Sequence, residues 1–125
     1  MQEPICFIGV DVSKAELVIS IDAGRPHAVR NEPQSIRRLL SQLPSKALIA
    51  MESTGRYHGL LAHLAVQAGF TVFVLNARDV YFYARALGSR AKTDAVDAVL
   101  IAHYLAQHHA RLHPWQAASP LLQQL

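Results

Sequence analysis

Short, continuous runs of apolar residues constrain the fold of this chain more than any other feature. "PICFIGVDV" (4–12) has the length and composition of a strand that is buried on both faces, and "KALIAMES" (46–53) and "FTVFVL" (70–75) are of the same kind. Because both faces of such a strand are apolar, the sheet that contains it needs other layers on both sides. Helices are the elements that most often supply those layers.

The rest of the chain provides those helices and two further strands. Residues 15–22 follow the first run so closely that the two predict a hairpin, and residues 27–32 predict an edge strand beside it. Helical spacing of apolar residues, or a proline or glycine at a helix end, marks residues 32–44, 56–69, 76–87 and 94–107. Three strands followed by alternating helices and strands predict an α/β fold, a mixed sheet flanked by helices.

The length of the chain fits one domain. A chain of 125 residues buries roughly two-thirds of its unfolded surface, and with 51% hydrophobic and 17% charged residues this one is expected to be globular. Two prolines among small residues predict a linker near the end. We therefore expect a catalytic or binding domain at residues 1–112, and a linker with the start of a following element at 113–125.

Charge, cysteine and histidine content narrow the class of protein. A net charge of +3 favours an anionic partner, although ordinary solubilising charge explains it equally well. The lone Cys6 has no partner for a disulfide, which indicates a reducing compartment, the cytoplasm. No run approaches the ~20 apolar residues of a membrane helix. The seven histidines lack the paired spacing of a zinc site.

Four acidic residues lie among apolar neighbours. Asp11 ends the first strand and Glu52 ends the strand at 46–53, while Asp94 and Asp97 share one face of the last helix. The carboxyl ends of neighbouring parallel strands meet at the edge where open α/β sheets bind ligands. If the last helix crosses that edge, the four carboxylates come together.

Carboxylates gathered in this way need cations. At about 5 Å and an effective dielectric constant near 20, each like-charged pair repels by roughly 3 kcal/mol. A site with oxygen donors alone prefers Mg²⁺ or Mn²⁺, and two such ions can drive an in-line phosphoryl displacement. The hypothesis is a two-metal site whose ligands and catalytic residues are Asp11, Glu52, Asp94 and Asp97.

Most of these acids also have an ordinary structural explanation. Asp94 suits the first turn of a helix, Asp11 suits a turn, and Glu52 suits a cap of the helix that follows it. Asp97 is harder to explain, because it lies one turn inside a helix that is apolar nearly all round. The acids are more informative together than singly.

Basic residues near these acids suit a phosphate-bearing substrate. Lys14 follows Asp11, and Arg56 lies beside a helix entrance whose backbone N–H groups favour an anion. Residues 76–92 mix cations with aromatic residues, a composition that can follow a nucleic-acid backbone and stack on bases. We expect most of those aromatic side chains in the core. The predicted nucleic-acid-binding residues are Lys14, Arg56, Arg78, Arg85, Arg90 and Lys92.

Three motifs resemble those of a known family. "FIGVDVSK", "MESTGRYHGLLAHLAVQAGFTVFVLNARDV" and "RALGSRAKTDAVDAVLIAHYLA", in this order, are similar to the DEDD transposases and Piv-like DNA invertases, the bridge-RNA-guided recombinases of bacterial insertion sequences. The resemblance covers most of residues 5–107. It implies a RuvC-like (RNase H-like) amino-terminal domain whose four acids support Mg²⁺-dependent DNA cleavage and joining, in transposition or site-specific inversion. It also implies DNA as a partner, a guide RNA, and a homo-oligomer of the full-length protein.

The chain departs from the family pattern at two points. Ala77 stands where family members often have a proline after the asparagine. Family proteins also continue into a second domain with a serine thought to be the nucleophile, and nothing in this chain matches it. We therefore assign that role to none of Ser13, Ser53 and Ser89, and expect an enzyme that is incomplete without a carboxy-terminal domain.

Two other functions stay open. A RuvC-type structure-selective DNA nuclease would use the same four acids with water as the nucleophile. A non-catalytic module for nucleic-acid binding or dimerisation would use the acids as structural caps. A third reading, an actin-like sugar kinase, rests only on "IGVDVSK" and lacks the second phosphate loop that such kinases need.

Overall fold

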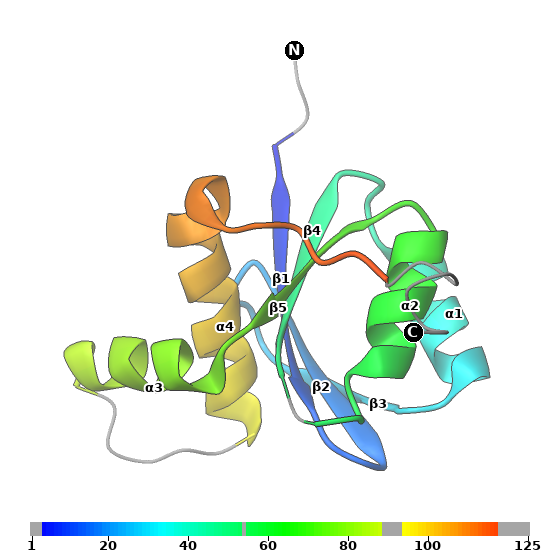
Figure 1. Ribbon diagram of the computed structural model, residues 1–125. Coiled ribbons are helices and arrows are strands. Elements are labelled where there is room, and N and C mark those ends of the chain that lie inside the picture. Colours follow the sequence, from blue (N-terminus) through cyan, green and yellow to red (C-terminus); the bar gives the residue numbers. More distant parts are fainter. Residues whose placement is uncertain (1–3, 54, 89–93, 118–125) are drawn as a thin grey trace, which may run out of the picture.

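A computed structural model describes residues 4–53, 55–88 and 94–117, and in it a five-stranded sheet lies between helices (Figure 1). The strands are β1 (Cys6–Val12), β2 (Glu16–Ile21), β3 (His27–Arg30), β4 (Ala47–Glu52) and β5 (Thr71–Leu75). Their order across the sheet is β3-β2-β1-β4-β5. The pairs among β3, β2 and β1 are antiparallel, and β4 is parallel to both β1 and β5. The predicted mixed α/β sheet is confirmed.

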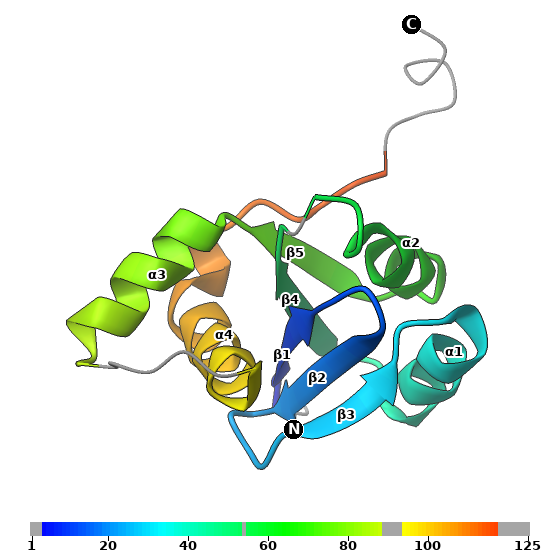
Figure 2. The ribbon, with the colours of Figure 1, turned by 90° about the horizontal axis from the view of Figure 1, so that it is seen from below.

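The helices form two layers (Figure 2). Seen along the sheet, α1 and α2 cover one face, α4 crosses the other face, and α3 packs beside α4. The helices are α1 (Pro33–Gln42), α2 (Gly59–Gln67), α3 (Ala77–Ala86) and α4 (Asp94–His108), followed by a short 3₁₀ helix, η1 (His109–Arg111). All four predicted helices are present. The second begins at Gly59 instead of residue 56, because Gly55 at φ +72° and the turn after it take up the start of the predicted segment.

Each central strand contributes to both layers of the core. Ile8 and Val10 of β1 belong to the cluster under α1 and α2, as do Ile49 and Met51 of β4. The residue between the last two, Ala50, packs with the α4 layer instead. Because successive side chains of a strand point to opposite faces, a strand between two helical layers has to be apolar throughout.

The sheet and α4 come into close contact at Gly9. A Cβ atom on this residue would overlap the backbone carbonyl of Ala98 and the backbone nitrogen of Ala102, both in α4. The absence of a side chain at Gly9 therefore lets α4 lie directly on β1.

Past η1 the described chain returns to the edge of the sheet. The Trp115 N–H donates a 2.7 Å hydrogen bond to the Val72 carbonyl of β5, and its ring meets the edge of His63 at 5.0 Å. The domain boundary at residue 112 stays a prediction. Among the described helices, none combines the length and the apolar character that crossing a membrane requires.

Candidate active site

Two of the predicted site residues lie at the carboxyl ends of neighbouring parallel strands, Asp11 next to last in β1 and Glu52 last in β4. The register of β1 and β4 places Val10 opposite Met51, and in each strand the next residue is an acid, Asp11 or Glu52. Strands that pair in this way lie about 4.8 Å apart. The two acids also share a face of the sheet with Gly9 and Ala50, which precede them by two positions and face α4. The structure therefore brings Asp11 and Glu52 to adjacent positions under α4.

The first turns of α4 lie at the same end of the sheet. Phe7, at the start of β1, packs against His109 beyond the carboxyl end of α4, with ring centroids 5.0 Å apart. Because Gly9 packs against the middle of the helix, α4 runs opposite to β1 and begins near the end where β1 finishes. Asp97 is only 5% exposed and lies one turn before Ile101, a residue of the sheet-facing core. Asp97 is therefore in the layer and at the end of the sheet that Asp11 and Glu52 occupy.

Burial distinguishes two of these acids. In the described part of the chain, the buried polar and charged residues are Ser20, Glu52 and Asp97, so both buried charges are predicted site residues. Asp11 is partly buried. Burying a carboxylate is costly unless hydrogen bonds or cations compensate it. Two buried carboxylates near one edge of a small domain therefore indicate a functional role for these residues.

The described acids alone do not make a complete metal-binding group. Among the described residues, no three Asp, Glu, His or Cys side chains are grouped closely enough to hold an ion. Asp94 is the first residue of α4, but its side chain lies outside what the structure describes. The predicted four-acid cluster is therefore supported in part by backbone placement and stays a prediction.

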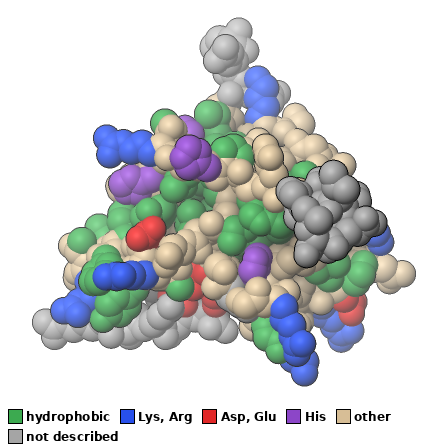
Figure 3. Space-filling model, viewed as in Figure 1, with side chains coloured by type: hydrophobic (Ala, Val, Ile, Leu, Met, Phe, Trp, Pro, Cys, Tyr) green, Lys and Arg blue, Asp and Glu red, His purple; other side chains and the backbone are tan. Residues whose placement is uncertain are grey.

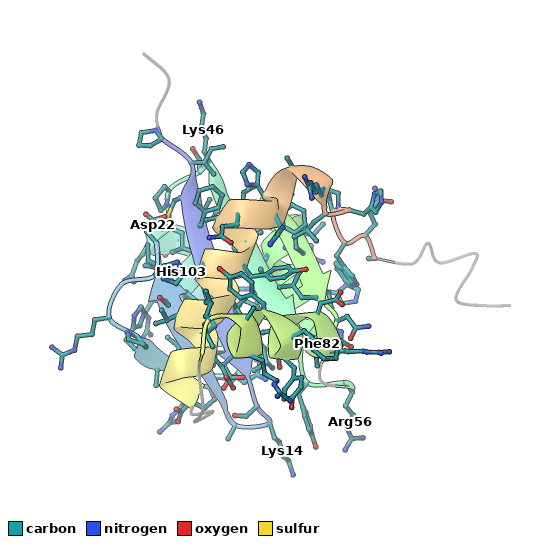
Figure 4. The ribbon with its side chains drawn as sticks, turned by 90° about the vertical axis from the view of Figure 1, so that its left-hand side faces the viewer. Lys14, Asp22, Lys46, Arg56, Phe82 and His103 are labelled. Atoms are coloured by element: carbon teal, nitrogen blue, oxygen red, sulfur yellow. The ribbon has the colours of Figure 1, made fainter. Side chains whose placement is uncertain are left out.

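The predicted basic residues divide between two regions. Lys14 and Arg56 are exposed at the end of the molecule where α4 begins, opposite Lys46 (Figure 4). Arg78 and Arg85 are exposed on α3. Both Arg90 and Lys92 lie outside the described residues.

Most aromatic side chains of α3 do not lie in the core, and this prediction was wrong. Tyr81 is 48% exposed and Phe82 is 54% exposed, whereas Val80 is the buried residue of the helix. The reason is the position of α3, which packs beside α4 and so buries only a narrow stripe. Tyr83 does face α4. Its ring lies 5.3 Å from that of Tyr104, and burial raises the pKa of both phenols, with the charge of Asp79 adding to the rise at Tyr104.

Cys6 is not suited to act as a nucleophile. Burial raises the pKa of its thiol, and the charge of Asp22 and a hydrogen bond to that carboxylate raise it further. The thiolate, which is the reactive form, is therefore disfavoured.

Asn31 is a residue near the site that the sequence analysis missed. Its Nδ2 donates to the Ser13 carbonyl at 2.9 Å and to the Tyr57 carbonyl at 3.1 Å. These bonds join the turn that carries Lys14 to the loop that carries Arg56. No local pattern predicts them, because the partners lie 18 and 26 positions away in the sequence.

Replacing Asn31 with alanine is expected to lower the free energy of unfolding by about 1–2 kcal/mol, because two carbonyl groups lose their donor. Urea denaturation followed by circular dichroism measures this change. The matched control is Gln34→Ala at an exposed position of α1, expected to change stability by less than about 0.5 kcal/mol. Equal effects of the two substitutions would show that the Asn31 bonds contribute nothing.

Comparison with protein families gives a match along nearly the whole chain. The family of DEDD transposases of the IS110 type, described as "Transposase", matches residues 8–125. The acids at positions 11, 52, 94 and 97 all fall inside this range.

Two curated proteins are similar in sequence to part of this chain. The pilin gene-inverting proteins of Moraxella lacunata and Moraxella bovis are each 39% identical to it over 71 residues, or 57% of this chain. The matched region is 21% of the length of each relative, so this chain spans about a fifth of those proteins.

Among solved structures, RuvC of Thermus thermophilus has a similar fold. RuvC in complex with a Holliday junction substrate superimposes with a TM-score of 0.56 and 14% identity, covering 90% of this chain and all of the other. A second structure of the same protein gives a TM-score of 0.53, also at 14% identity, over 88% of this chain and 99% of that one. The RuvC-like, RNase H-like fold expected from the sequence is confirmed.

Proposed function

Because this chain belongs to the DEDD transposase family, we propose that it is the amino-terminal catalytic domain of a transposase or DNA invertase. The observation that supports this function most directly is the placement of acids at one edge of the sheet. Asp11 and Glu52 occupy adjacent strand ends, and the buried Asp97 lies in the same layer. The reaction would be the cleavage and joining of DNA strands in transposition or site-specific inversion.

The acids would act as ligands of divalent cations. We assign Asp11, Glu52, Asp94 and Asp97 to two ions, Mg²⁺ or Mn²⁺, because carboxylate oxygens are the hard donors that these ions prefer. Such ions, when bound, polarise the phosphate and stabilise charge on the leaving oxygen. The chain itself would hold the carboxylates in place, with Glu52 of β4 and Asp97 of α4 both buried from water.

The exposed cations would hold the DNA backbone against this edge. Lys14 and Arg56 lie on loops at the acidic end of the sheet, where they would contact phosphates near the cleaved bond (Figure 4). Arg78 and Arg85 would extend the contact along α3, and we assign Arg90 and Lys92 to the same surface. We further propose that the full-length protein is a homo-oligomer in the cytoplasm and that it works with a guide RNA.

The proposed domain would not recombine DNA alone. The curated relatives are about five times as long as the segment matched here, and none of the serines near the acids is assigned as nucleophile. We propose that residues 1–112 form the catalytic domain, that 113–125 lead into a further element, and that the nucleophile comes from a separate domain.

Metal binding by the acids is the first test. Mn²⁺ titration followed by electron paramagnetic resonance is expected to show binding to the chain, and Glu52→Gln is expected to weaken it at least about tenfold because a ligand is lost. The control is Glu16→Gln, at an exposed position of β2. If Glu52→Gln and Glu16→Gln bind Mn²⁺ as the original chain does, the acids are not metal ligands and the function proposed here is wrong.

The alternative function is a structure-selective nuclease, in which water is the nucleophile instead of a serine. The RuvC structure described above contains a Holliday junction substrate, so the same branched DNA is the probe. Cleavage of that DNA with Mg²⁺ by the 125-residue chain alone would favour the nuclease. Its absence, together with Mn²⁺ binding, would favour a transposase domain that needs a second domain.

A further inference from the structure

Four side chains on the outer side of α3 form a continuous row of contacts, in which the two rings meet edge to face. The Arg78 guanidinium lies 5.7 Å from the centre of the Phe82 ring, and Phe82 meets Tyr81 with ring centroids 5.5 Å apart. Arg85 continues the row, since its guanidinium lies 5.9 Å from the Tyr81 ring and its Nη1 donates to the Tyr81 hydroxyl at 3.2 Å. We call Arg78, Phe82, Tyr81 and Arg85 the α3 row.

The α3 row is exposed although half of it is aromatic. Tyr81 and Phe82 are each about half exposed, and Phe82 projects from α3 on the side away from the sheet (Figure 4). Cationic and hydrophobic side chains also lie side by side over this helix in the space-filling view (Figure 3). The packing of the domain does not require exposed rings here, because Val80 already attaches α3 to the core.

Charge and shape indicate which partner fits this surface. The α3 row has a guanidinium group at each end and no acidic side chain, a charge that suits an anionic partner. Nucleic-acid bases stack on aromatic rings and on arginine planes, while arginines also neutralise phosphates. Bases in a duplex are already stacked on their neighbours, so exposed rings favour unpaired bases.

The α3 row also starts at the proposed active site. Leu75, the last residue of β5, pairs with Glu52, and α3 begins two residues later. Arg78 lies in the first turn of α3, and the side chains of the row extend from there to Arg85 in the last turn. A strand lying on the row would therefore lead away from the acids.

We propose that the α3 row is a stacking platform for unpaired bases of a single-stranded segment next to the cleaved bond. This inference rests on the proposed function for the identity of the ligand as nucleic acid. It adds the form of the ligand, a single strand instead of a duplex, and the residues that recognise it.

The test compares single-stranded and duplex DNA in the absence of metal. Fluorescence anisotropy of labelled oligonucleotides, with EDTA present, measures binding to the 125-residue chain and to Y81A/F82A. Because each stacked base contributes a factor of about 5 to 150 in affinity, the double substitution is expected to weaken single-strand binding at least tenfold. Duplex binding is expected to change less than about twofold, since phosphate contacts dominate it.

Two controls separate stacking from loss of structure. Ile5→Ala/Val66→Ala truncates two exposed apolar side chains in other parts of the chain, 45% and 36% exposed, and is expected to leave single-strand binding unchanged. The thermal unfolding curve of Y81A/F82A is expected to match that of the original chain. In addition, photo-crosslinking of an oligonucleotide that contains 5-iodouracil is expected to label residues 78–85.

Several results would overturn the platform. Unchanged single-strand binding by Y81A/F82A would do so, as would equal losses for single strands and duplex. Dissociation of a dimer by Y81A/F82A, with single-strand affinity retained, would show that the row is a protein contact. The binding test is done in EDTA and so does not depend on metal. A failed Mn²⁺ test at Glu52 would therefore not affect the conclusion about the α3 row, and a failed stacking test would not affect the proposed metal site.

Discussion

Gly9→Ala is expected to lower the free energy of unfolding by at least about 3 kcal/mol, the upper range for overpacking a core. The added methyl group would overlap backbone atoms of Ala98 and Ala102. Since backbone cannot rotate away as a flexible side chain does, either β1 or α4 has to move. Chemical denaturation monitored by circular dichroism measures the loss.

Gly59→Ala is the matched control for that substitution. It starts α2, and a Cβ atom there would meet nothing within 4 Å. Because alanine is favoured over glycine in helices, the control is expected to be neutral or to stabilise by up to about 1 kcal/mol. If Gly9→Ala proves as stable as Gly59→Ala, α4 does not lie on β1 as the structure has it, and the placement of Asp97 loses its support.

Asp97→Asn in the full-length protein is expected to reduce Mg²⁺-dependent DNA cleavage by about a thousandfold or more. A ligand of a catalytic ion contributes several kcal/mol of transition-state stabilisation, and each 1.36 kcal/mol is a factor of ten in rate. An amide keeps the size of the side chain but lacks the charge. Single-turnover cleavage, followed over a range of Mg²⁺ concentrations, measures the rate.

The matched control is Asp79→Asn, which neutralises an exposed acid in the first turn of α3. It is expected to cleave at the original rate, because its carboxylate is exposed and acts on Tyr104, two turns beyond Asp97 in α4. Retention of more than a tenth of the original rate by Asp97→Asn would remove this residue from the catalytic group. Asp11, Glu52 and Asp94 would then have to account for metal binding.

The elements of this fold could be predicted because each has a local cause. The runs around Ile8, Ile49 and Val72 are apolar throughout, and the structure buries each of them between two layers. The ends of α2 and α3 also have a local cause. Gly69 and Gly88, which follow these helices, adopt φ values of +94° and +82°, which other residues rarely do. The turn at residues 55–58 has no comparable local signal, so the predicted start of α2 was three residues too early.

The site could be predicted only in part, because its geometry depends on distant pairings. The sequence marks Asp11 and Glu52 as unusual, but only the register of β1 with β4 makes them neighbours. Asn31 carries no local signal at all. Exposure of Tyr81 and Phe82 was missed for a related reason, since the face that a helix buries depends on what it packs against, which for α3 is mainly one other helix.

The proposed catalytic group is drawn from positions 11, 52 and 94–97, and so from nearly the whole length of the domain. During translation, a nascent polypeptide that has not yet released α4 from the ribosome lacks half of the proposed ligands. A proteolytic fragment that ends before α4 lacks them as well. Long-range assembly of this kind would confine DNA cutting to molecules whose folding is finished.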